Sequence, residues 1–171
     1  ISMTADEKIK ESERWLEKIM RSYHHSNRTD LIDNVIAFLN CVNSIPDHLL
    51  EEYNQKFLGI TLQDKLFPNV FKIEAKKQSH HVAQQFIMDF KSEKGKIESD
   101  PIGKILTTKR DLNTHRDNQK TIKRVVVVGG VKKSDAFSVN FPELVGNVDD
   151  SCEKLLNLMK GLVSILRNKY P

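Results

Sequence analysis

The residues best suited to chemistry lie in the segment KRDLNTHRDN, residues 109–118. In this segment four residues separate Arg110 from His115, and Asp111 directly follows Arg110. A histidine titrates near neutral pH, so it can accept or donate a proton during a reaction. An arginine stays charged and presents a planar fork that matches a phosphate. Together the two residue types can move a proton and hold a phosphate.

The charge around this segment indicates the kind of partner. Seven basic residues stand against two acidic ones between Lys104 and Arg124, so this window carries +5 while the rest of the chain carries −1. A local positive field attracts polyanions, and nucleic acid is the commonest of them. The side chains predicted to bind nucleic acid are Lys109, Arg116, Lys120, Lys123 and Arg124. A solvated charged face explains the same window about equally well.

Helical periodicity predicts the elements that position the motif. Apolar residues recur every three or four positions over 4–23, over 31–58 and, less regularly, over 70–91. Pro46 is expected to break or restart the second of these helices, and 59–72 is expected to form a loop. Asp100 and Pro101 predict the start of a fourth helix, which carries the motif, because aspartate accepts hydrogen bonds from free backbone amides and proline suits the first helical position.

The remaining segments predict a polar connection, a hairpin and a last helix. Residues 91–99 are polar, and the β-branched and alternating residues of 121–141 are typical of a β-hairpin. An amphipathic helix opens at Asp149. The predicted fold is therefore mainly α: an up-and-down helical bundle of about five helices with a β-hairpin inserted before the last helix, in a single domain over 1–171.

Composition narrows the function classes further. Cys41 and Cys152 lie far apart without metal-type spacing, so no metal site and no cofactor is predicted, and Cys41 is expected to be a small buried hydrophobe. No apolar run approaches the length of a membrane span, and the first residues lack the apolar core of a signal peptide. We therefore expect a cytoplasmic protein without a membrane partner.

In this helical setting, the Arg110, Asp111 and His115 pattern resembles the R-x4-6-H signature of the HEPN superfamily. That family is a small helical bundle with its motif on a late helix and a further helix closing the bundle, and the order of elements expected here is similar. The resemblance implies a homodimer in which two motifs share a cleft. On one straight helix Arg110 and His115 lie about 140° apart, which such a dimer would reconcile. Asp111 and His115 share a face, so Asp111 can orient the imidazole, or the pair can be an ordinary surface contact.

The resemblance also implies a function: a metal-independent endoribonuclease in which Arg110, Asp111 and His115 form the catalytic set and the 2′-OH attacks the phosphate. It further implies a role in defence or in a toxin–antitoxin system, with an antitoxin protein as a possible partner. Some members are modified on a tyrosine two residues after the histidine, where this chain has Asp117. Two alternatives stay open: a non-catalytic module of the same fold that binds RNA or a nucleotide, and a helical interaction domain whose basic face docks a protein.

Overall fold

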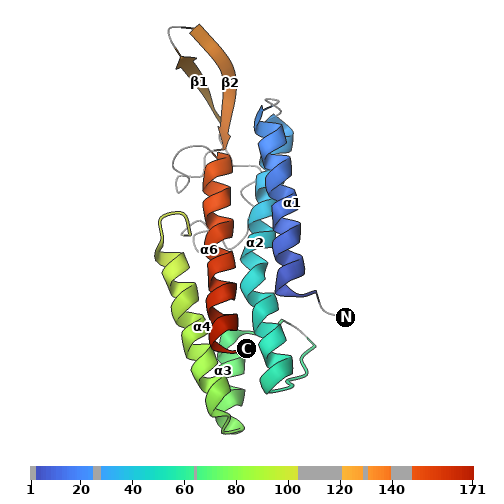
Figure 1. Cartoon of the computed structure of the whole chain (residues 1–171). Helices are drawn as coiled ribbons and strands as arrows, with labels where there is room; N and C mark the ends of the chain where they lie inside the picture. Colours follow the sequence, from blue (N-terminus) through green and yellow to red (C-terminus); the bar gives the residue numbers. More distant parts are fainter. Residues whose placement is uncertain (1–2, 25–27, 64, 104–120, 129–130, 140–147) are drawn as a thin grey trace.

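A computed structural model describes residues 3–24, 28–63, 65–103, 121–128, 131–139 and 148–171, with the backbone alone at 23–24, at 28–29 and in the two strands. The chain is mainly helical, as the sequence predicts (Figure 1). The helices of the described part are α1 (Ala5–His24), α2 (Arg28–Phe57), α3 (Pro68–Lys77), α4 (His81–Ser99) and α6 (Val148–Lys169).

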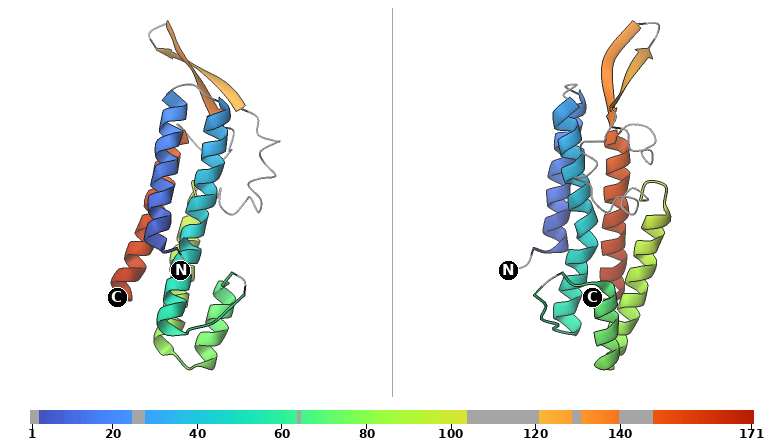
Figure 2. Two further views of the ribbon diagram at one scale, coloured as in Figure 1. Left: turned by 90° about the vertical axis from the view of Figure 1, so that its right-hand side faces the viewer. Right: turned by 180° about the vertical axis from the view of Figure 1, so that it is seen from behind.

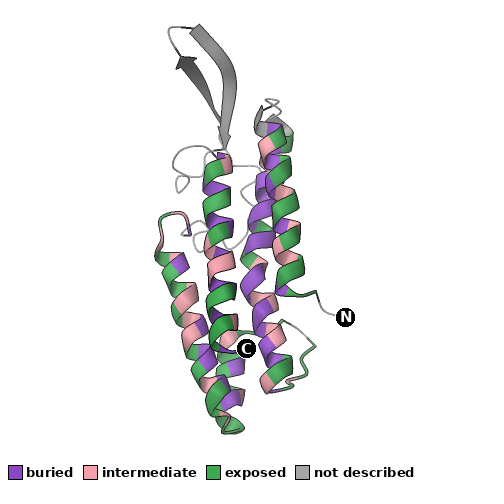
Figure 3. Ribbon diagram, in the orientation of Figure 1, coloured by how far each residue is buried: buried purple, intermediate pink, exposed green. Residues whose placement is uncertain are grey.

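Four long helices form an up-and-down bundle. Helices α1 and α4 run in one direction and α2 and α6 in the other (Figures 1 and 2). Helix α6 packs against α1, α2 and α4, and the short helix α3 packs beside α4 at one end of the bundle. The buried residues of each long helix face the interior, as Figure 3 shows.

The core joins aliphatic rows from the helices to an aromatic cluster at the end near α3. Helix α2 contributes the fully buried Val35, Phe38, Leu39, Val42, Ile45, Leu49 and Leu50. In the aromatic cluster the rings of Tyr53 and Phe86 stack with their centres 4.1 Å apart, and Phe71 lies 5.6 Å from Phe86. Burial of these side chains is the main stabilising term, because each contributes roughly 1.5–3 kcal/mol.

The break expected in the second helix at Pro46 is wrong. The helix continues through this residue from Arg28 to Phe57, and Pro46 is itself buried. A proline inside a helix costs about 3 kcal/mol because it removes one hydrogen bond and crowds the preceding turn. The fully buried apolar side chains on both sides of Pro46 outweigh that cost, so tertiary packing overrides the local preference.

The predicted third helix, 70–91, is two helices. Helix α3 begins at Pro68, which takes the first helical position instead of marking a loop. The chain turns at 78–80, where Ser79 has a φ of 51°, and His80 caps α4 by accepting a hydrogen bond from the Ala83 N–H at 3.0 Å. No glycine or proline marks this turn, so the sequence pattern did not reveal it.

The expected polar connection over 91–99 is also wrong, because α4 continues to Ser99. Lysine and glutamate are good helix formers, and the ion pairs Lys96–Glu93 at 2.7 Å and Lys94–Glu98 at 3.8 Å lie along this stretch. Ile97 is buried and anchors the last turns of α4. The first and last predicted helices, by contrast, are confirmed as α1 and α6.

Two strands precede α6. The backbone of β1 (Thr121–Val128) pairs antiparallel with that of β2 (Val131–Val139), and the register shifts between Val126 and Val127. Thr121 faces Val139 at one end of the pair.

Among the helices that the structure describes, none combines the length and the apolar character needed to cross a membrane.

Candidate functional site

The catalytic residues predicted from the sequence, Arg110, Asp111 and His115, lie outside the described residues. The same holds for the predicted nucleic-acid-binding residues Lys109, Arg116 and Lys120 and for the side chains of Lys123 and Arg124, whose backbone belongs to β1. The described part of the chain includes the end of α4, which precedes the motif segment in the sequence.

The chain enters the motif segment through a fixed turn at the end of α4. The Asp100 N–H donates to the carbonyls of Ile97 and Lys96, which closes α4, and the Asp100 carboxylate accepts from the Ile102 N–H at 2.9 Å. A hydrogen bond from a free amide to Asp100 was expected, but residues 101–103 form a turn and not the first turn of the expected helix. The rest of that expected helix lies outside the described residues. Gly103 is buried, and a Cβ atom on it would overlap the carbonyl oxygen of Ile97. Only glycine fits there, seven residues before Arg110.

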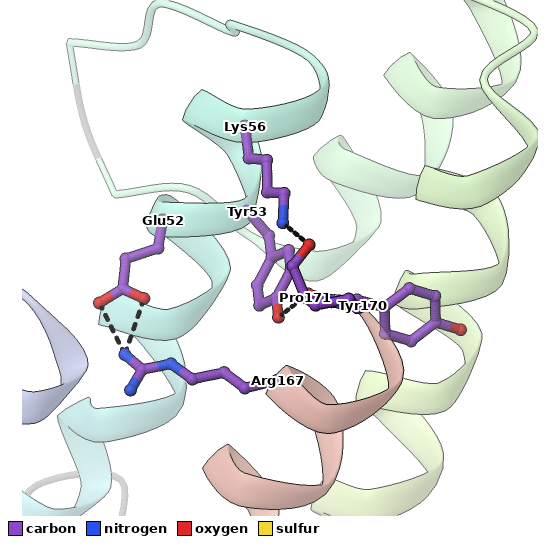
Figure 4. Close-up of a pocket in the computed structure, with 6 residues that line it drawn as sticks. All are labelled: Glu52, Tyr53, Lys56, Arg167, Tyr170 and Pro171. Carbon is purple, nitrogen blue, oxygen red and sulfur yellow. Dashed lines mark hydrogen bonds and ion pairs between the residues drawn. The ribbon is translucent and has the colours of Figure 1, made fainter.

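A cavity of about 260 Å³ lies where α2 and α6 meet at the end of the bundle (Figure 4). Its charged side chains are Glu52, Lys56 and Arg167. The Arg167 guanidinium lies 2.7 Å from Asp6 on α1 and 3.0 Å from Glu52 on α2. Glu52 also accepts the Ala5 N–H at 2.7 Å, so it satisfies a free amide at the start of α1. Arg167 thus ties three helices together.

The electrostatics of this cavity favour a structural role. Partial burial acts to lower the Arg167 pKa, but the hydrogen bonds and charges of Asp6 and Glu52 outweigh it and raise the pKa. Burial raises the pKa of Tyr53, whose hydroxyl donates to the Tyr170 carbonyl at 2.7 Å. Because both carboxylates engage Arg167, its fork is already occupied and offers little to a phosphate.

A second polar cluster joins α4 to the end of α6. Asp89 accepts hydrogen bonds from the Tyr170 hydroxyl and from Lys169, whose ammonium lies 2.6 Å away. Burial acts to raise the Asp89 pKa, but the hydrogen bonds from Lys169 and Tyr170 prevail and lower it. The pKa of Tyr170 is raised, by burial first and then by Asp89. This cluster is also a helix-to-helix tie.

A shallow groove of about 270 Å³ runs between α4 and α6. Its floor is aliphatic, with Ile97 and Leu162 buried, Leu158 half-buried and Ile165 half-exposed, and Glu93 and Lys96 stand on its rim. No cluster of three or more histidine, cysteine, aspartate or glutamate side chains able to hold a metal ion occurs in the part of the chain that the structure describes.

The cysteines are inert, and the expectation for Cys41 is confirmed. Cys41 is buried beside Ser12, whose hydroxyl donates to the thiol sulfur at 3.1 Å, and burial raises the Cys41 pKa. Cys152 is fully buried, and burial likewise raises its pKa. Both thiols therefore stay protonated, and a protonated thiol is a poor nucleophile.

The Arg167 tie was missed by sequence reasoning. Its partners lie 161 and 115 residues away along the chain, and no local pattern marks such a contact. A local sign of this contact was Arg167 itself, an arginine in the last turn of an amphipathic helix. Basic residues are common at that position because they interact favourably with the helix dipole, so the arginine alone did not indicate a contact between helices.

Comparisons of the chain with protein-family models, with curated proteins and with solved structures give no match.

Proposed function

We propose that this chain is a metal-independent endoribonuclease of HEPN type, acting in the cytoplasm. The observation that carries the proposal is the pairing of Arg110 with His115 in the only strongly basic window of the sequence. The mainly helical bundle supports it, because α6 packs against three other helices and closes the bundle after the motif segment. The fixed turn at Asp100 and Gly103 supports it too, since a catalytic segment needs a rigid attachment.

In the proposed reaction the ribose 2′-OH attacks the adjacent phosphorus, and the bond to the 5′ oxygen of the next nucleotide breaks. His115 moves a proton at one of these two oxygens, Arg110 binds the phosphate and stabilises its charge in the transition state, and Asp111 orients the imidazole. Flanking phosphates bind Lys109, Arg116, Lys120, Lys123 and Arg124. The products are a 2′,3′-cyclic phosphate and a 5′-OH end. DNA lacks the nucleophile, so it is not a substrate.

The proposal includes a homodimer. On one helix, Arg110 and His115 point about 140° apart, so a single copy does not easily direct both at one phosphate. A two-fold interface near the motif brings Arg110 of one copy toward His115 of the other. A role in defence, with an antitoxin protein as inhibitor, belongs to the same proposal.

The β-hairpin inserted before the last helix is also part of the proposal. The β-branched run of 121–128 and the antiparallel pairing of β1 with β2 support it. Lys123 and Arg124 lie in β1, so the hairpin would carry basic residues next to the motif segment. Chemical-shift measurements by NMR over 121–139 test it, and helical shifts there would contradict it.

Incubation of the purified protein with end-labelled RNA tests the function directly. Cleavage is expected with and without EDTA, and the new ends should carry a 2′,3′-cyclic phosphate, which mass spectrometry identifies. A substrate with a single 2′-deoxy nucleotide at the mapped cleavage position should resist cutting there. Loss of activity with EDTA, or cleavage at the deoxy position, would contradict the proposed chemistry. Binding without cleavage would favour the alternative of an RNA-binding module.

A further inference from the structure

Exposed apolar side chains gather around the short helix α3 at one end of the bundle. Of the eight large hydrophobic residues that are exposed in the described part of the chain, five lie between Leu62 and Val82. Three of them follow one another at intervals of three residues: Phe67, the N-cap residue of α3, and Val70 and Ile73 within the helix. We call these three residues the α3 ridge. Their exposed fractions are 57%, 37% and 55%. Such local concentration on a protein surface is typical of an interaction site.

The α3 ridge is held on a rigid element. Helix α3 is anchored by Phe71 and Ala75, both fully buried, and the Phe71 ring packs against Phe86 in the aromatic core. Lys91 on α4 donates to the Asn69 side chain at 2.6 Å, which fixes the first turn of α3. Helix α3 packs chiefly against α4 at one end of the bundle (Figure 2), and the ridge side chains remain exposed. A rigid, exposed ridge loses little conformational entropy when it binds.

The charges beside the ridge are basic. Lys72, Lys76 and Lys77 are exposed on α3, where the acidic residue is Glu74, 3.8 Å from Lys77. No ion pair within the described residues includes Lys72 or Lys76. Ammonium groups next to apolar side chains complement a surface that is apolar in its centre and acidic at its edges.

We propose that the α3 ridge is a docking surface for an amphipathic helix of a protein partner, one whose apolar stripe is flanked by carboxylates. Side chains spaced by three on one helix form a ridge that fits the groove between side-chain rows of a second helix. Phe67, Val70 and Ile73 fill that groove, and Lys72 and Lys76 pair with the flanking carboxylates. The proposal does not depend on the ribonuclease activity.

Two fluorescein-labelled helical peptides test the proposal. Both carry a leucine stripe at helical spacing, and the stripe is flanked by glutamates in one peptide and by lysines in the other. Fluorescence anisotropy should show the wild-type protein binding the glutamate peptide and not the lysine peptide. Ile73→Ser should weaken this binding by about tenfold or more, because the variant loses the burial of one large aliphatic side chain.

A charge swap makes the test specific. The double variant Lys72→Glu with Lys76→Glu should lose the glutamate peptide and gain the lysine peptide. Met88→Ser, which changes an exposed residue of α4, and Lys10→Glu, which changes an exposed residue of α1, serve as matched controls and should bind like wild type. All five positions are exposed, so circular dichroism and melting temperature should stay unchanged.

Three results would overturn the proposal. The first is equal binding of both peptides, or binding that Ile73→Ser leaves intact. The second is a wild-type protein that sediments as a dimer while Ile73→Ser sediments as a monomer, which would assign the ridge to a second copy of this chain. The third is co-sedimentation with phosphatidylserine-containing vesicles that Ile73→Ser abolishes, which would assign it to a lipid surface.

Discussion

Arg110 has two tasks in the proposed reaction: binding the phosphate and stabilising its transition-state charge. Arg110→Ala should therefore lose RNA cleavage and some RNA affinity together. Arg110→Lys keeps the charge but replaces the bidentate fork with a point charge, so we expect it to recover binding without full cleavage. Cleavage rates and filter-binding affinities of the three proteins check this. Full activity in Arg110→Lys would show that only charge matters at this position.

The lowered pKa of Asp89 predicts that the stability of the folded protein depends on pH. Asp89 has a lowered pKa in the folded protein, so its contribution to the free energy of unfolding is present above the unfolded pKa of about 3.9 and is lost as the pH falls through the folded value. Asp89→Asn should reduce stability at pH 7, and the difference from wild type should shrink as the pH is lowered below 4. Urea unfolding across this range measures it. A difference that stays constant down to the acid limit would contradict the account.

Two glycines at the end of α4 have opposite predicted effects. Gly95 lies within the helix with open space around its Cβ position, so Gly95→Ala should stabilise the protein by about 0.5–1 kcal/mol. Gly103→Ala introduces a clash with the Ile97 carbonyl group and should destabilise the protein by more than that.

Chemical denaturation of both variants and of wild type measures whether each substitution raises or lowers the free energy of unfolding. Because Gly103 leads into the motif, Gly103→Ala should also reduce RNA cleavage, while Gly95→Ala should not. A Gly103→Ala protein that is as stable as wild type would show that the turn is not fixed in solution.

The long amphipathic helices were predictable, and the breaks between elements were not. Sequence patterns located both ends of α1 and the start of α6 to within about one residue, because each helix buries one continuous apolar stripe. The break predicted at Pro46 was wrong because the stabilisation gained by burying the neighbouring apolar side chains cannot be judged from their spacing in the sequence. The turn at Ser79 carries no turn-type glycine or proline, and its αL backbone is held by the packing of α3 on α4.

The candidate site was likewise predictable from the sequence only in part. Local chemistry indicated Arg110 and His115 because their residue types and spacing are visible in the sequence. The Arg167 tie joins three helices through partners more than a hundred residues away, so it emerges only from the fold. Exposure of the α3 ridge was equally hidden, because Val70 and Ile73 fit a helical pattern whichever face is buried.

The proposed dimer predicts complementation between inactive variants. If Arg110 of one copy acts with His115 of the partner subunit, a heterodimer of Arg110→Ala and His115→Ala contains one intact pair. Random mixing should then restore about one quarter of wild-type cleavage, since half the dimers are mixed and each holds one of two sites. Mixing the refolded proteins and assaying RNA cleavage checks this. No recovery, with heterodimers demonstrated by mass spectrometry, would place each site within one copy.

Single-turnover cleavage of labelled RNA by wild type and His115→Ala, in EDTA, tests the ribonuclease proposal most directly. His81→Ala, which changes an exposed histidine on α4, is the matched control. His115→Ala should cut about 10²- to 10⁴-fold more slowly than wild type while binding RNA with similar affinity, because it removes a proton-transfer group and no phosphate contact. His81→Ala should cut at the wild-type rate. Equal cleavage by wild type and His115→Ala would contradict the account.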